Sequence, residues 1–181
     1  MSSSHRSLLV LGGARSGKSR YAQTLAEESG LDLLLIATAE AHDEEMEARI
    51  ARHKADRDER WSLVEAPINL AAQISGRAKE GRLIVVDCLT LWLSNVMLAG
   101  RDIDAMQEGL ASVVEKAQGQ LILISNEVGQ GIVPSTPMGR QFRDAQGRLN
   151  QRLAQACSDV VLVSAGLPLH LKPAPRPQIT F

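Results

Sequence analysis

Residues 8–19 read LLVLGGARSGKS, an apolar run that passes directly into a glycine-rich loop. The loop, Gly12–Ser19, fits the pattern G-x-x-x-x-G-K-[ST], and the residues after it have helical spacing, with Tyr21 and Leu25 one turn apart. Glycines in such a loop let successive backbone N–H groups at a helix N-terminus point at phosphate oxygens. A glycine-rich turn that matches by chance is the alternative, but the flanking strand and helix favour a phosphate-binding P-loop. We therefore predict a nucleotide site here.

The residues of this loop have separate predicted roles. Lys18 would reach the β- and γ-phosphates of a nucleotide, and the Ser19 hydroxyl would coordinate Mg²⁺. A carboxylate at the end of a neighbouring buried strand should hold the water ligands of that ion, and Asp87 closes the apolar run LIVVD. The predicted phosphate cradle comprises Gly12, Gly13, Ala14, Arg15, Ser16, Gly17, Lys18 and Ser19. The predicted metal ligands are Ser19 and Asp87.

Short apolar runs recur along the chain, each too short for a helix and apolar enough for a strand buried on both faces. They are Leu8–Leu11, Leu33–Ala37, Leu83–Val86, Leu121–Ser125 and Val160–Val163. Longer stretches with helical spacing lie between most of them: Lys18–Ser29, Asp43–Arg57, Leu70–Lys79, Asp102–Gln118 and Arg140–Cys157. This alternation predicts an α/β fold, a mostly parallel sheet flanked by helices. Ser62–Glu65 and Leu169–Lys172 are candidates for short additional strands, the second at an antiparallel edge.

Composition limits the classes of protein to consider. The 181 residues fit one domain, which we place at 1–172, followed by a Pro-rich tail, 173–181, that we expect to be mobile. With 20 Lys+Arg against 21 Asp+Glu, the net charge of -1 gives no overall field that attracts nucleic acid or an anionic membrane. Cys88 and Cys157 lack the spacing of a zinc or redox site, so we expect buried thiols. No apolar stretch approaches the ~18–20 residues of a membrane span and no signal peptide is evident, which favours a cytoplasmic protein.

A second motif lies in the polar segment that precedes Trp61. Arg49, His53 and Arg57 recur at every fourth position and would share one face of a helix. The arginines could bind a phosphate, and the imidazole, with an unperturbed pKa of ~6.5, could act as base or nucleophile at pH 7. A solvated helix face with Glu–Arg pairs is the alternative that these residues leave open.

Several segments together resemble one enzyme family. They are GGARSGKS, IATA, EMEARIARHKADR followed by Trp61, VVDCLTLWLSN, SNEVGQGIVP and FRDAQGRLNQRLA. In this order they resemble the bifunctional adenosylcobinamide kinase/adenosylcobinamide-phosphate guanylyltransferase family of cobalamin biosynthesis, from about Leu8 to Lys172. Asp58 stands where we expect proline, and the Pro-rich tail is extra. Neither departure touches a proposed catalytic group.

The resemblance implies a RecA-like P-loop fold, a homotrimer and two reactions on one protein. Adenosylcobinamide would be phosphorylated with ATP or GTP, and GMP from GTP would then pass to adenosylcobinamide phosphate through a guanylylated His53, in the family's RI-x-x-H-K segment. His53 and Lys18 are thus the predicted catalytic residues. Backbone groups following the second strand would contact the nucleotide, and a carboxylate could bind a guanine edge or ribose. Arg49, Arg52 and Arg57 could neutralise the transferring phosphate, although Arg52 lies ~100° around the helix from His53, and Lys54 is a weaker candidate. These further nucleotide-binding candidates are Ala37, Thr38, Ala39, Lys54, Arg57 and Glu65.

Other interpretations remain open from the residues alone. The chain could be another P-loop small-molecule kinase without guanylyl transfer, or a nucleotide-switched binding protein. Glu65 could be an ordinary surface carboxylate. Asn126 and Glu127, which follow the fourth apolar run, could position substrate or water, or could form a structural cap.

Overall fold

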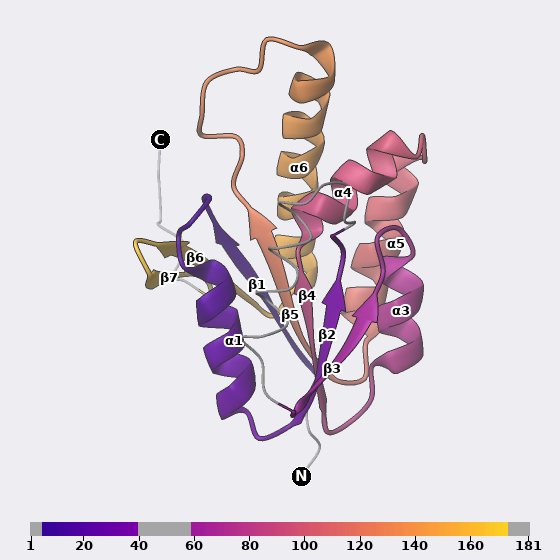
Figure 1. The fold of residues 1–181 in the computed structure, drawn as a ribbon, viewed down its shortest axis with the longest axis vertical. Coiled ribbons are helices and arrows are strands. Elements are labelled where there is room, and N and C mark those ends of the chain that lie inside the picture. The colour runs from indigo at the N-terminus through magenta and orange to yellow at the C-terminus, as the bar shows by residue number, and fades with distance from the viewer. Residues whose placement is uncertain (1–4, 40–58, 174–181) are drawn as a thin grey trace, which may run out of the picture.

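One sheet organises the part of the chain that the computed structural model describes, residues 5–39 and 59–173. Its seven strands lie in the order β3-β2-β4-β5-β1-β6-β7 (Figure 1). The strands are β1 (Arg6–Gly12), β2 (Asp32–Ala37), β3 (Trp61–Glu65), β4 (Arg82–Asp87), β5 (Gln120–Asn126), β6 (Asp159–Ser164) and β7 (Leu167–Lys172). All neighbouring pairs are parallel except β6 and β7, which are antiparallel. The predicted α/β class, the mostly parallel sheet and the antiparallel edge are confirmed.

Helices cover both faces of this sheet, as predicted. They are α1 (Lys18–Glu28), α3 (Leu70–Arg77), α4 (Leu89–Leu98), α5 (Ile103–Lys116) and α6 (Pro137–Ala156). Helix α1 lies on one face, and α3 to α6 lie on the other (Figure 1). The predicted helix Asp43–Arg57 falls outside the described residues.

Two apolar cores explain why the strands read as continuous apolar runs. In β1, Leu9 and Leu11 pack toward α3 to α6, whereas Val10 packs toward α1. Because successive residues of a strand point to opposite faces, a sheet covered on both faces needs apolar side chains at every position. Trp92 of α4 is fully buried in the larger core, and its indole N–H donates to the Ile68 carbonyl at 2.8 Å.

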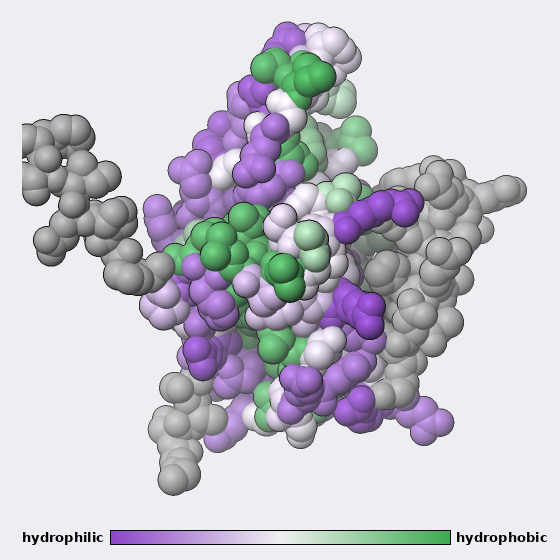
Figure 2. Space-filling view, turned by 90° about the vertical axis from the view of Figure 1, so that its left-hand side faces the viewer, coloured by the Kyte–Doolittle hydropathy of each residue, from purple (hydrophilic) through white to green (hydrophobic). Residues whose placement is uncertain are grey.

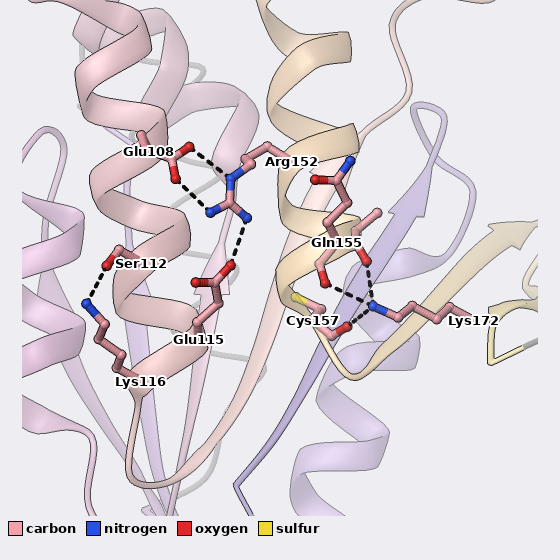
Figure 3. Close-up of polar contacts among 9 residues, drawn as sticks. Glu108, Ser112, Glu115, Lys116, Arg152, Gln155, Cys157 and Lys172 are labelled. Atoms are coloured by element: carbon pink, nitrogen blue, oxygen red, sulfur yellow. Dashed lines mark hydrogen bonds and ion pairs between the residues drawn. The ribbon is translucent and has the colours of Figure 1, made fainter.

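Charged side chains form hydrogen bonds and ion pairs between helix α6 and its neighbours α5 and β7 (Figure 3). Arg152 donates to Glu108 at 2.7 and 2.9 Å and to Glu115 at 2.9 Å, both on α5. From β7, the Lys172 ammonium donates to three carbonyls at the end of α6, those of Ala154, Gln155 and Cys157, at 3.0, 3.0 and 2.6 Å. A cation at the C-terminus of a helix satisfies carbonyls that have no partner within the helix.

The strand register decides which residues meet at the carboxyl edge of the sheet. Gly12 at the end of β1 pairs with Asn126 at the end of β5. Ala37 at the end of β2 pairs with Glu65 of β3 on one side and Asp87 of β4 on the other. Ligands of open α/β sheets bind outside the carboxyl ends of the strands, so this edge is where a functional site is expected. Among the described helices, none has the length and apolar character that a membrane crossing requires.

Candidate functional site

The loop between β1 and α1 has a backbone that only glycine allows at two points. Gly17, the residue before α1, has φ 95°, a left-handed conformation. At Gly12, a Cβ atom would lie 2.5 Å from the Ser16 Oγ and 2.6 Å from the Val163 carbonyl oxygen. Both contacts are too close for any side chain, so the two glycines of the motif are sterically required. This geometry supports the prediction of a P-loop.

The side chains and backbone of the loop gather at the start of α1. The Lys18 ammonium donates to the Gly13 carbonyl at 3.1 Å, so the lysine folds back over its own loop. The Ser16 Oγ is buried and has no hydrogen-bond partner in the described part of the chain. Since the residue before α1 is a glycine, no side chain caps the first N–H groups of this helix. Uncapped N–H groups, a lysine and a buried hydroxyl form a cradle suited to phosphate oxygens.

The Asp87 carboxylate lies at the same edge as this loop. Burial raises the pKa of the Cys88 thiol, the neighbouring Asp87 carboxylate raises it further, and the Lys18 ammonium partly offsets the increase. Both charges therefore act on the same thiol, although they belong to segments that are far apart in the sequence. Asp87 therefore lies at the same sheet edge as the P-loop, with β5 between its strand and β1, and its role in the site stays a prediction.

Thr38 ties the end of β2 to the residue that follows Asp87. Its hydroxyl donates to the Cys88 carbonyl at 2.6 Å and accepts from the Cys88 N–H at 2.9 Å. Its backbone N–H donates to the Asp87 carbonyl at 3.3 Å, and its carbonyl accepts from the Asn95 side chain at 2.8 Å. Thr38 is fully buried, and its polar groups hold the peptide unit that directly follows the Asp87 side chain. Sequence reasoning proposed it as a nucleotide contact and missed this structural role, because its partners lie 49 or more positions away.

The end of β5 completes the edge. Asn126 donates from its backbone N–H and from its side-chain amide to the Thr90 hydroxyl, at 3.0 and 3.1 Å. The next residue, Glu127, donates its backbone N–H to the Gly12 carbonyl at 3.1 Å. The residues after β5 are thus attached both to the P-loop and to α4.

Comparison with known proteins now decides the family. Residues 8–171 match the family described as cobinamide kinase / cobinamide phosphate guanyltransferase. The chain belongs to this family. Over 169 residues it is 47% identical to the bifunctional adenosylcobalamin biosynthesis protein CobP of Pseudomonas aeruginosa, covering 92% of this chain and 98% of CobP. It is 36% identical over 180 residues to CobU of Escherichia coli, covering 91% of this chain and 99% of CobU.

A solved structure from Pyrococcus horikoshii OT3 has the same kind of fold. Its TM-score is 0.53 at 9% sequence identity, over 91% of this chain and 85% of that one. The TM-score indicates a shared architecture, whereas an identity of 9% carries no information about activity. The resemblance to the cobinamide kinase/guanyltransferase family that the motifs indicated is confirmed by the curated relatives instead.

The predicted site residues of this family member divide into two groups. The described ones lie at the carboxyl edge of the sheet or in the loops that leave it: Gly12 to Ser19, Ala37, Thr38, Ala39, Glu65 and Asp87. The remaining candidates, His53, Lys54 and Arg57, lie outside the described residues, as does Arg49. Nucleotide binding by either group stays a prediction.

Ser19 and Asp87 offer the donor atoms that Mg²⁺ prefers, one hydroxyl and one carboxylate. The described residues contain no group of three or more His, Cys, Asp or Glu side chains that could hold a metal by themselves. A site with few protein ligands suits an ion that keeps several waters and binds nucleotide phosphates. Mg²⁺ binding by this pair therefore fits the residues present and remains a prediction.

Proposed function

We propose that this protein phosphorylates adenosylcobinamide with ATP or GTP and then transfers GMP from GTP to the product, giving adenosylcobinamide-GDP in cobalamin biosynthesis. The observation that supports the proposal is the P-loop at the end of β1 and Asp87 at the end of β4, at one edge of the sheet with β5 between the two strands, in a chain of the cobinamide kinase/guanyltransferase family.

In the kinase step the chain acts by positioning and by neutralising charge. The loop N–H groups and Lys18 would hold the β- and γ-phosphates while the hydroxyl of the cobinamide aminopropanol arm attacks the γ-phosphorus. Mg²⁺, held by Ser19 and Asp87, would supply further positive charge to the phosphates. Thr38 supports this arrangement, because it fixes the peptide unit that directly follows the Asp87 side chain.

In the guanylyl transfer, His53 would be the nucleophile. A neutral imidazole nitrogen would attack the α-phosphorus of GTP, forming an N–P bond and releasing pyrophosphate. A phosphate oxygen of adenosylcobinamide phosphate would then displace the histidine and take the GMP. Arg49, Arg52 and Arg57 would neutralise the transferring phosphate, with Lys54 as a weaker candidate. Glu65 would bind the guanine edge or ribose.

We also propose that the protein works as a homotrimer in the cytoplasm. Strand β7 is an edge strand, and its leucines are exposed: Leu167 by 72%, Leu169 by 58% and Leu171 by 45%. Hydrophobic side chains gather on the face of the molecule that contains this edge (Figure 2). An exposed apolar edge favours association with another chain. Light scattering should report three times the chain mass, and a fully active monomer at every concentration would contradict the trimer.

Two labelled nucleotides test the proposed chemistry. GTP labelled at the α-phosphate should leave label on the denatured protein, and ATP labelled at the γ-phosphate should transfer it to cobinamide. A small-molecule kinase without guanylyl transfer would give only the second result. A nucleotide-switched binding protein would exchange nucleotide without consuming cobinamide. Either of these outcomes would overturn the proposal.

A further inference from the structure

A network of buried polar side chains connects α6 to the end of β5. The Ser125 hydroxyl donates to the Asn150 Oδ1 at 2.7 Å, and the Gln146 side-chain amide donates to both of these, at 2.9 and 3.0 Å. All three residues are buried. From the far side of the network, the Asn150 amide donates to the Asn126 carbonyl at 3.2 Å and to the Glu127 Oε1 at 3.0 Å.

This network fixes the orientation of the Asn150 amide. Its oxygen accepts two hydrogen bonds from Ser125 and Gln146, so its NH₂ group must face away from them, toward Glu127. A buried amide that is satisfied on both sides cannot rotate without leaving polar groups unpaired, at a cost of about 1–3 kcal/mol for each group. The fold therefore holds one oxygen of the Glu127 carboxylate rigidly, while the side chain remains only half-buried.

The backbone of Glu127 lies directly beside the P-loop. Strand β5 lies between β1, which leads into the P-loop, and β4, which ends at Asp87. The Glu127 N–H donates to the carbonyl of Gly12, the first residue of the P-loop. Of the carboxylates that end or directly follow the described strands at this edge, Asp87 is assigned to the metal. Glu65 lies at the far edge of the sheet, on β3. Glu127 is the one that remains next to the loop.

We propose that Glu127 is the general base of the kinase step and that Asn150 is its positioning residue. The hydroxyl oxygen of cobinamide forms a bond to the γ-phosphorus, and the Glu127 carboxylate accepts the proton of that hydroxyl. The bond from the γ-phosphorus to the β,γ-bridging oxygen breaks, its electron pair leaves with ADP or GDP, and the proton on Glu127 passes to solvent. This inference rests on the proposed kinase activity.

The variant Glu127→Gln shows whether Glu127 acts as a general base or only as a structural cap. The carbonyl oxygen of the new amide can still accept from Asn150, so the cap is kept, but the amide cannot take up the proton. We expect kcat for cobinamide phosphorylation to fall about 100-fold or more. KM for both substrates and labelling by α-labelled GTP should stay near the wild-type values. A kcat within about threefold of wild type, or an equal loss of both activities, would overturn the proposal.

Asn150→Asp tests the positioning role. It keeps an oxygen acceptor for Ser125 and Gln146, removes the donor to Glu127 and to the Asn126 carbonyl, and sets a second carboxylate against that of Glu127. We expect kcat to fall at constant KM. In the double variant Asn150→Asp/Glu127→Gln, the amide at position 127 can donate to the carboxylate at position 150. The hydrogen bond between the two positions is then restored, but position 127 has no group that can act as a base. Recovery of kcat in the double variant would show a structural cap and refute the base. Wild-type protein that does not phosphorylate cobinamide would refute the proposed function and this inference with it. Wild-type activity with a fully active Glu127→Gln variant would refute this inference alone.

Discussion

Replacing the buried Thr38 by valine should destabilise the protein by about 2–4 kcal/mol. Valine has nearly the same shape as threonine, so the substitution removes the hydroxyl and leaves the packing intact. The Cys88 carbonyl then loses its 2.6 Å donor and the Cys88 N–H loses its 2.9 Å acceptor, both inside the protein. The Cys88 N–H is left without a partner, at a cost of about 1–3 kcal/mol. The Cys88 carbonyl still accepts from the Trp92 N–H at 3.2 Å and loses one of two hydrogen bonds, worth about 1 kcal/mol, so the two losses together give the stated range. The loss is a large share of the ~5–15 kcal/mol by which domains are usually stable.

Urea unfolding followed by circular dichroism, at one fixed protein concentration, measures this effect. With a slope of about 2 kcal/mol per molar urea, the midpoint should fall by about 1–2 M. Thr38→Ser is the matched control, because it keeps the hydroxyl and removes only a methyl group, at a cost of about 1 kcal/mol. A valine variant as stable as wild type, or more stable than the serine variant, would refute the role assigned to the hydroxyl. Since Thr38 also fixes the backbone next to the Asp87 side chain, nucleotide affinity should fall in the valine variant and be retained in the serine variant.

Four further predictions concern the site and the framework around it. Lys18→Ala should lower the kinase rate about 10²–10³-fold and weaken guanylylation, because a neutral side chain cannot stabilise phosphate charge; near-normal rates in a folded variant would exclude the P-loop assignment. His53→Ala should abolish protein labelling by α-labelled GTP while cobinamide phosphorylation persists, and the wild-type label should be lost in mild acid, as expected of a histidine phosphoramidate. Label that the variant retains would exclude His53 as the acceptor. Lys172→Met removes the donor to three carbonyls at the end of α6 (Figure 3) and should cost about 1–3 kcal/mol in urea unfolding; an unchanged midpoint would contradict this. The Arg6 guanidinium holds the pKa of Asp159 below its usual range, so this pair stabilises the fold above about pH 4 and the contribution is lost as the pH falls through the lowered pKa. Arg6→Met should therefore cost up to about 1 kcal/mol at pH 7, a small amount because the pair is partly exposed, and progressively less as the pH falls through the lowered pKa of Asp159.

Local sequence patterns were sufficient for the fold class, and they led to the prediction of a P-loop. Runs of apolar residues predict strands buried on both faces, because every position of such a strand meets a core. The glycine spacing of Gly12–Ser19 predicts the P-loop, because the conformation of that loop depends on residues only a few positions apart. Asp87 could be assigned from its position at the end of an apolar run. Each of these inferences uses information within one element and its immediate neighbours in the chain.

The tertiary structure decided what those elements bring together. The order of the strands places β5 between the P-loop strand and the Asp87 strand, and nothing in the sequence of β5 fixes that order. Glu127 could be read from the sequence as either a functional group or a cap. Its contacts with Gly12 and with Asn150 of α6 exist only after β1, β5 and α6 have packed. The bond between Thr38 and Cys88 likewise joins residues 50 positions apart. Such contacts depend on packing between distant segments, because a hydrogen bond requires atoms within about 3 Å of each other and a local pattern of residue types does not specify that distance.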